Sequence, residues 1–144
     1  MHSILHRVTI ETSPEAVYQS LVEERSLSKW WTKATASGKV GSTNCFFFGA
    51  DGSHQVDMEV CELKLNELIV WKCIRGPWQA TGKFAFSITP DERGAVLHFS
   101  HQGWAETDDF YQHCNTKWGF FLGISLKNYL ENGTGQPHPQ DPSI

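Results

Sequence analysis

Residues 99–133 read FSHQGWAETDDFYQHCNTKWGFFLGISLKNYLENG and contain the longest helical pattern of the chain. The stretch begins as a strand, turns at Gln102-Gly103 and continues with the three- and four-residue spacing of an amphipathic helix. Thr107 or Asp108 can cap its first turn and Gly133 can end it. We predict a helix over about residues 107–132, covered on its apolar side by another layer. That side carries Phe110, Cys114, Trp118, Phe121, Ser125 and Tyr129.

The layer that covers the helix is predicted to be an antiparallel sheet formed by the residues before it. Between residues 35 and 99, turn residues recur at short intervals, which suits hairpins better than the long crossovers of a parallel sheet. Residues 54–60 alternate between apolar and polar side chains, so one face of the sheet is wet and the other is covered. The predicted strands span residues 43–48, 54–63, 68–75, 78–89 and 95–101, with a weaker strand near 35–40.

Two short helices are predicted to follow a first strand over residues 4–12. Ser13 is suited to cap the first helix, with Pro14 at its first position. The second helix spans residues 26–31, with Ser26 as a possible cap. The order is one strand, two short helices, about six strands and one long helix. It predicts an α+β fold, in which a curved antiparallel sheet of six to seven strands grips the long helix.

Length and composition indicate one domain with a large aromatic core. The chain has 144 residues, of which 40% are hydrophobic, and it contains six tryptophans and nine phenylalanines. We assign residues 1–133 to a single domain and residues 134–144, rich in Pro and Gly, to a flexible C-terminal tail. The net charge of −4 is scattered, without the basic cluster that nucleic-acid binding requires, so we predict no nucleic-acid partner.

Cysteine usage and the N-terminus predict a cytoplasmic protein with reduced thiols and no metal site. The N-terminus lacks the apolar run of a signal peptide, and no stretch approaches the roughly 18 apolar residues of a membrane span. The four cysteines, at positions 45, 61, 73 and 114, form no CxxC pair. Cys73 and Cys114 are therefore expected to be free, buried side chains, not zinc ligands or disulfide partners.

Four segments of the chain together resemble one known family, and they are SPEAVYQSLVEERSLSKWW at 13–31, VWKCIRGPW at 70–78, FSHQGW at 99–104 and CNTKWGFFLGISLKNYLENGTGQP at 114–137. Together they are similar to the START-like, or SRPBCC, superfamily, whose helix-grip fold also occurs in the birch-pollen allergen, polyketide cyclases and lipid-transfer domains. Within it they resemble the branch related to the C-terminal domain of the activator of heat-shock-protein-90 ATPase. Trp78 follows Gly76-Pro77 directly, whereas family members often have a Glu before that Trp.

The resemblance implies a cavity between the sheet and the C-terminal helix. We predict that this cavity binds a hydrophobic or aromatic small molecule, without a cofactor and without catalysis, in a monomer or homodimer. Its lining is expected to combine inward-facing strand positions, the aromatic helix face and the tryptophans that end the second short helix. The predicted lining residues are Trp30, Trp31, Phe46, Phe48, Met58, Trp71, Cys73, Phe84, Phe86, Phe99, His101, Trp104, Cys114, Trp118, Phe121, Leu122 and Ser125.

Two polar residues of this set each have two interpretations. His101 either reaches the mouth of the cavity as an acid or base, or bonds a backbone carbonyl near Gly103 and holds the turn. Ser125 either offers a polar anchor inside the cavity, or bonds back to the carbonyl four residues earlier. If Ser125 faces a cavity, leucine at that position is expected to be tolerated in folding and to block ligands.

Two alternative functions stay open beside the binding protein. One is an enzyme of the cyclase or hydratase type that uses His101 and bound water. The other is a protein-interaction module that modulates a chaperone or another partner. The chain contains no GxSxG, no Gly-rich phosphate loop and no HExxH, so several common enzyme classes are not supported.

Overall fold

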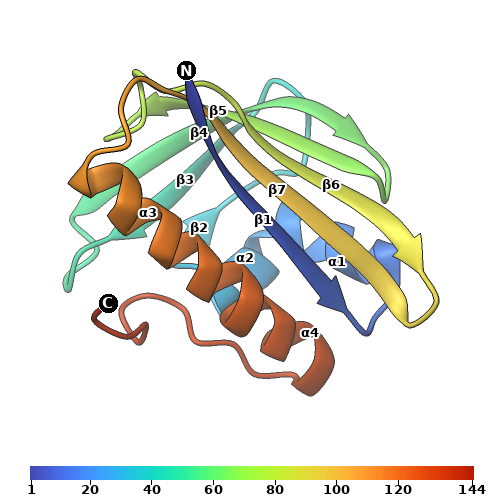
Figure 1. Cartoon of the computed structure of the whole chain (residues 1–144). Coiled ribbons are helices and arrows are strands. Elements are labelled where there is room, and N and C mark those ends of the chain that lie inside the picture. The colour runs from blue at the N-terminus through green and yellow to red at the C-terminus, as the bar shows by residue number, and fades with distance from the viewer.

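Seven antiparallel strands form one curved sheet in the computed structural model, which describes residues 1–144 (Figure 1). The sheet order is β1-β7-β6-β5-β4-β3-β2, so only the pairing of β1 with β7 joins strands distant in the sequence. The predicted α+β helix-grip fold is confirmed. The strands are β1 (His2–Ile10), β2 (Ala34–Thr35), β3 (Thr43–Phe48), β4 (His54–Lys64), β5 (Leu68–Arg75), β6 (Phe84–Asp91) and β7 (Gly94–Trp104).

The two short helices, α1 (Pro14–Val22) and α2 (Glu24–Trp30), follow β1 as predicted. The Ser13 hydroxyl accepts a hydrogen bond from the Ala16 amide at 3.1 Å, which is the predicted cap of α1. Helix α2 begins two residues before its predicted start. Ser26 therefore lies inside the helix as a buried residue and does not cap it.

The long C-terminal helix consists of α3 (Asp109–Phe120), the π-helical segment η1 (Phe121–Leu126) and α4 (Lys127–Asn132). The Asp108 carboxylate caps its start by accepting from the Tyr111 amide at 3.0 Å, and Gly133 ends it with a φ of 85°. The predicted span is thus confirmed to within two residues. The π-helical segment was not predicted, because its i→i+5 hydrogen bonds leave no spacing signal over six residues. None of the helices combines the length and apolar character that a membrane crossing needs.

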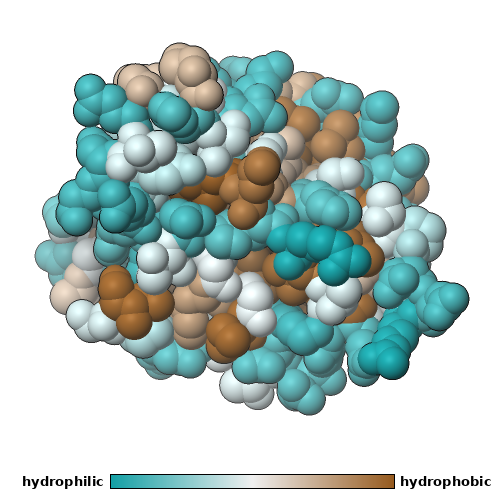
Figure 2. Space-filling model, viewed as in Figure 1, coloured by the Kyte–Doolittle hydropathy of each residue, from teal (hydrophilic) through white to brown (hydrophobic).

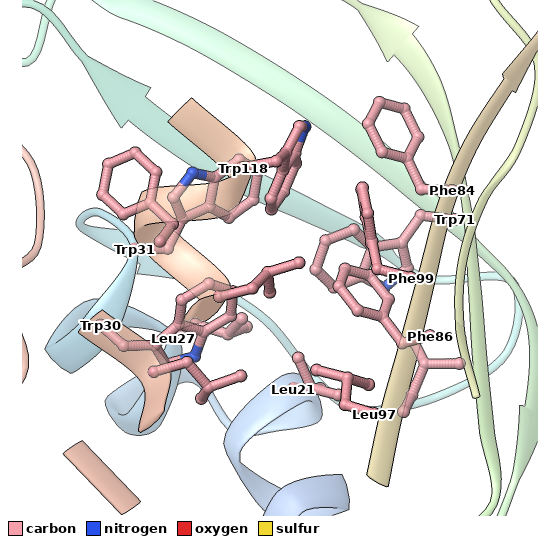
Figure 3. Packing of buried hydrophobic residues seen from close by; sticks show 14 of the residues in the cluster. Leu21, Leu27, Trp30, Trp31, Trp71, Phe84, Phe86, Leu97, Phe99 and Trp118 are labelled. Atoms are coloured by element: carbon pink, nitrogen blue, oxygen red, sulfur yellow. The ribbon is translucent and has the colours of Figure 1, made fainter. Parts of the chain in front are cut away.

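The concave face of the sheet carries the side chains that pack on the helix. Val56, Met58 and Val60 on β4 are buried, and the polar residues between them face outward, as the alternation predicts. The rings of the core come from all layers, and the close-up shows them converging between sheet and helix (Figure 3). Ring centroids lie 4.5 Å apart for Phe99 and Trp118, which joins β7 directly to α3. The space beneath the middle of the helix is therefore filled by side chains.

Residues 78–83 form a turn, whereas the sequence predicted the start of a strand there. Pro77 has no amide hydrogen to donate to a strand ladder, and β6 begins only at Phe84. The turn lies against the end of β7, where Gly82 donates to the Gln102 carbonyl at 2.7 Å. Gly103 has a φ of 76°, and a Cβ there would lie 2.4 Å from the Gly82 nitrogen, so only glycine fits this approach.

Two other predicted strands also differ in extent. The strand predicted over residues 4–12 spans His2–Ile10, and the weak strand near 35–40 is reduced to the two residues of β2. Gly38 and Gly41 both have positive φ values, 69° and 86°, which bends the chain out of an extended ladder after β2. The remaining predicted strands agree with the structure within three residues at each end, apart from the later start of β6.

Residues 134–144 have specific contacts, whereas the sequence predicted a loose tail. We call them the C-terminal strap, since they run back along α4 and α3 (Figure 1). The Gln136 amide donates to the Ser125 hydroxyl at 2.8 Å, and the His138 amide donates to the Trp31 carbonyl at 2.7 Å. The strap therefore supplies donors to a hydroxyl of the π-helical segment and to the carbonyl of the residue that ends α2. The sequence prediction missed this because the acceptors lie more than ten residues away.

Candidate functional site

A cleft of about 590 Å³ opens at one end of the sheet, beside α3. Its walls come from α3, the tip of the β3–β4 hairpin, the loop after β5 and the strap. Such a volume is within the range of small-molecule sites. Surface colouring in Figure 2 shows apolar groups emerging between hydrophilic ones on the helix side of the molecule. The cleft is lined by Trp31, Phe48, His54, Val56, Pro77, Trp78, Phe110, His113, Cys114, Lys117, Trp118, Phe121, His138 and Asp141.

The floor of the cleft is aromatic and belongs to the core. Trp31 and Trp118 have ring centroids 4.9 Å apart, and Phe48 lies 5.5 Å from Trp31 in an edge-on arrangement. Trp31, Trp118 and Phe121 are each less than 5% exposed, so these rings belong to the core as well as to the cleft lining. Because the rings are packed on the sheet, the floor is rigid before any ligand arrives.

The structure divides the predicted lining residues into two groups. Five of them line the cleft, namely Trp31, Phe48, Cys114, Trp118 and Phe121. The other twelve lie outside the cleft lining, and all of them are buried. Helical and strand periodicity identifies which side of an element faces inward, but it does not say whether that side meets a cleft or another ring. The twelve are Trp30, Phe46, Met58, Trp71, Cys73, Phe84, Phe86, Phe99, His101, Trp104, Leu122 and Ser125.

His101 is fully buried and holds a turn. Its Nε2 lies 2.8 Å from the Thr81 hydroxyl, which itself donates to the Trp78 carbonyl at 2.7 Å, so the imidazole is the donor. Its ring stacks on Phe84 with centroids 3.6 Å apart. Burial, with a smaller contribution from Lys72, lowers the pKa of His101 to about 3. The neutral imidazole thus fixes the turn that carries Trp78, through Thr81 instead of the expected backbone carbonyl.

Ser125 is also buried, and it neither lines the cleft nor bonds the carbonyl four residues earlier, the two interpretations drawn from the sequence. Its hydroxyl donates to the Trp30 carbonyl at 2.6 Å and accepts from the Gln136 amide at 2.8 Å. It therefore connects the end of α2, the π-helical segment and the strap. The serine satisfies two backbone groups at a point where three segments meet.

Nine cleft residues were not in the predicted set. Phe110 was on the helical stripe and Val56 on the strand alternation, so both patterns contained a usable signal. Strap residues gave no signal, because a Pro-rich segment has no period that places it against a helix. The nine are His54, Val56, Pro77, Trp78, Phe110, His113, Lys117, His138 and Asp141.

Charged groups gather where the strap meets α3. The Lys117 ammonium forms a salt bridge with Asp141 and donates to the Pro142 carbonyl at 2.9 Å. The other carboxylate oxygen of Asp141 accepts from His138 Nδ1 at 2.8 Å. Burial alone would raise the pKa of Asp141, but hydrogen bonds from Lys117 and His138 outweigh it and lower that pKa. The carboxylate is therefore ionised at neutral pH, at the edge of a cleft whose floor is aromatic.

Both interior cysteines are poor nucleophiles. Cys114 lines the cleft, and burial raises the pKa of its thiol to about 11. Burial likewise raises the pKa of the Cys73 thiol, which donates to the Arg75 carbonyl at 3.4 Å. All four cysteines are free, and the structure brings no three His, Cys, Asp or Glu side chains into a metal-binding group.

We expect the native protein to expose at most two of its four thiols to a thiol reagent at pH 7. Cys73 and Cys114 are buried and protonated, whereas Cys45 and Cys61 are partly exposed. Titration with a chromogenic disulfide before and after denaturation gives the number of reactive thiols in the native and in the denatured protein. Rapid reaction of all four thiols in the native state would contradict the burial of Cys73 and Cys114.

Comparison with known proteins shows which family the chain is similar to. The family model described as activator of Hsp90 ATPase homolog 1-like protein matches residues 11–131. The solved Aha1 dimer from Colwellia psychrerythraea is 38% identical, with 94% of this chain and 100% of that chain covered and a TM-score of 0.84. None of the curated proteins matches the chain.

More distant structures share the fold alone. A protein from Staphylococcus saprophyticus is 17% identical over 97% of this chain and 100% of its own, with a TM-score of 0.79. A protein from Chromobacterium violaceum is 21% identical over 91% of this chain and 99% of its own, with a TM-score of 0.74. The helix-grip architecture is thus kept at low sequence identity.

Proposed function

The chain belongs to the activator of Hsp90 ATPase homolog 1-like family, and we propose that it binds an apolar or aromatic small molecule in the cleft beside α3 without transforming it. One observation carries the proposal, which is the packed aromatic floor formed by Trp31, Trp118 and Phe121. Rigid rings at the base of a concave site offer contact area at little entropic cost. The four free cysteines are compatible with a protein that works in the reducing cytoplasm.

Binding fits the cleft better than catalysis does. Acid–base chemistry at His101 has no support, because that imidazole is buried outside the cleft lining. Cys114 is protonated at neutral pH, so it is not an activated nucleophile. His138 bonds Asp141 through its ring and bonds no hydroxyl or thiol. A nucleophile paired with a base is therefore missing from the cleft lining.

We expect the protein to bind the neutral probe N-phenyl-1-naphthylamine with a rise in probe fluorescence. Replacing Phe48 by alanine removes an aromatic wall of the cleft and is expected to weaken binding about three- to tenfold. Phe47 is the matched control, since it is the neighbouring ring on β3 and does not line the cleft. Equal effects of Phe48→Ala and Phe47→Ala, or a folded wild type without probe binding, would contradict the proposal.

A protein partner is the second candidate, and the exposure of Phe110 favours it. This ring is 40% exposed at the rim of the cleft, and exposed aromatic groups are common interface anchors. The Colwellia protein was solved as a dimer, and the family description names an Hsp90 ATPase activator. Light scattering tests whether the chain pairs with a second copy, and Hsp90 ATPase rates test whether it acts on the chaperone. Both are measured with wild type and with Phe110→Ser. A monomer that leaves the ATPase rate unchanged would contradict both.

A further inference from the structure

The strap brings the only carboxylate into the cleft. Apart from the protonated Cys114, the ionisable side chains that line it are one lysine, three histidines and Asp141. All of these except Asp141 belong to the types that donate hydrogen bonds to anions. Without the strap, the polar part of the cleft would be formed by His54, His113 and Lys117 alone, and it would favour a negative group.

Lys117 lies between the aromatic floor and the strap. Its ammonium is 5.5 Å from the centre of the Phe121 ring, and both of its hydrogen bonds go to the strap residues Asp141 and Pro142. No other segment of the chain neutralises this ammonium. The cation of the cleft is therefore paired only with groups that a movement of the strap would remove.

Asp141 is held as a bound anion would be held. Its side chain is only 7% exposed, and an ionised carboxylate at such burial is unfavourable unless its oxygens are paired. One oxygen meets the Lys117 ammonium and the other meets His138 Nδ1 at 2.8 Å. Two donors thus converge on one carboxylate at the edge of an apolar cleft, which is a common arrangement for recognition of an acid.

We propose that Lys117 is the centre of an anion subsite, that the cleft takes an apolar molecule with one anionic group, and that Asp141 occupies the subsite until such a ligand displaces it. This inference rests on the proposed function, because it specifies the chemistry of the same ligand. The apolar body of the ligand lies on the aromatic floor, and its anionic group replaces the Asp141 carboxylate at Lys117.

The attachment of the strap is compatible with this exchange. Its first half is held through the backbone, by Gln136 to Ser125 and by His138 to Trp31. Beyond His138, its bonds to the rest of the chain are the two made with Lys117. Once an anion binds Lys117, residues 141–144 lose both of these bonds while the first half stays in place. The strap then moves as an end segment and the domain keeps its fold.

Two fluorescent probes that differ in one anionic group test the subsite. They are 8-anilino-1-naphthalenesulfonate and N-phenyl-1-naphthylamine, which share the same aromatic body. Asp141→Asn removes the competing charge, so we expect the dissociation constant of the sulfonate probe to fall about three- to tenfold. Lys117→Met removes the cation, and we expect the same constant to rise by a similar factor. The neutral probe is expected to change less than about twofold in both variants.

Lys127→Met is the matched control for loss of a lysine from this helix. Lys127 forms a salt bridge with Glu131 at 2.8 Å and does not line the cleft, so neither probe should respond to it. If the ratio of the two affinities is unchanged in Asp141→Asn and Lys117→Met while both probes bind, the anion subsite is overturned and the binding function stands. If neither probe binds any folded variant, both the binding function and the subsite are overturned.

Discussion

Replacing Ser125 with leucine is expected to destabilise the protein by about 2–6 kcal/mol, because overpacking costs about 1–3 kcal/mol and buried groups left unpaired cost about as much again. The Ser125 hydroxyl is fully buried between the Trp30 carbonyl and the Gln136 amide. Leucine offers neither a donor nor an acceptor, and its added carbons have to fit at a fully buried position outside the lining of the cleft beside α3. This outcome is the opposite of what a cavity-facing serine would give.

Thermal unfolding measures this effect as a fall in melting temperature on the order of 10 °C for a chain of this size. Asn128→Leu is the control, since Asn128 is exposed one turn later on the same helix. Both substitutions replace a polar side chain with leucine. The control is expected to melt within a few degrees of wild type. A Ser125→Leu variant as stable as the control would show that the space around the hydroxyl is not filled.

Replacing Trp71 with alanine is expected to destabilise the protein by about 3–5 kcal/mol, because it removes a large ring from a filled core. Trp71 is fully buried on β5, at 4.7 Å from the Phe86 centroid and 5.5 Å from that of Phe46. It also stacks against Trp31 at 6.0 Å, so its loss undermines the floor of the cleft. Both stability and probe binding are therefore expected to fall in Trp71→Ala.

Trp71→Phe separates the role of volume from that of the indole nitrogen. The Trp71 Nε1 is buried and has no hydrogen-bond partner, so phenylalanine removes an unpaired donor along with part of the ring. The cost of this variant is expected to be at most about half that of alanine. Chemical denaturation of both variants gives the two free energies of unfolding. A phenylalanine variant as unstable as the alanine variant would indicate that the indole nitrogen has a partner in solution.

Local patterns in the sequence were sufficient to predict the architecture. The Ser13 cap, the alternation on β4, and the long helical stripe with the helix end at Gly133 each follow from interactions within a few residues. Because such rules act along one segment, they predict the elements, their order and their inward faces. The helix-grip fold follows from that order, since the long apolar helix face has only the curved sheet to cover it.

The cleft depended on contacts that no local rule contains. Trp71 and Trp118 both lie on inward faces, yet only Trp118 lines the cleft, since the depth of a residue depends on what packs against it from elsewhere. Ser125 meets Trp30 across 95 residues, and Lys117 meets Asp141 across 24. Pairings at such separations are selected by the folded chain as a whole. Sequence periodicity therefore predicted the aromatic core, and only the tertiary structure decided which of its rings, and which charges of the strap, face the cleft.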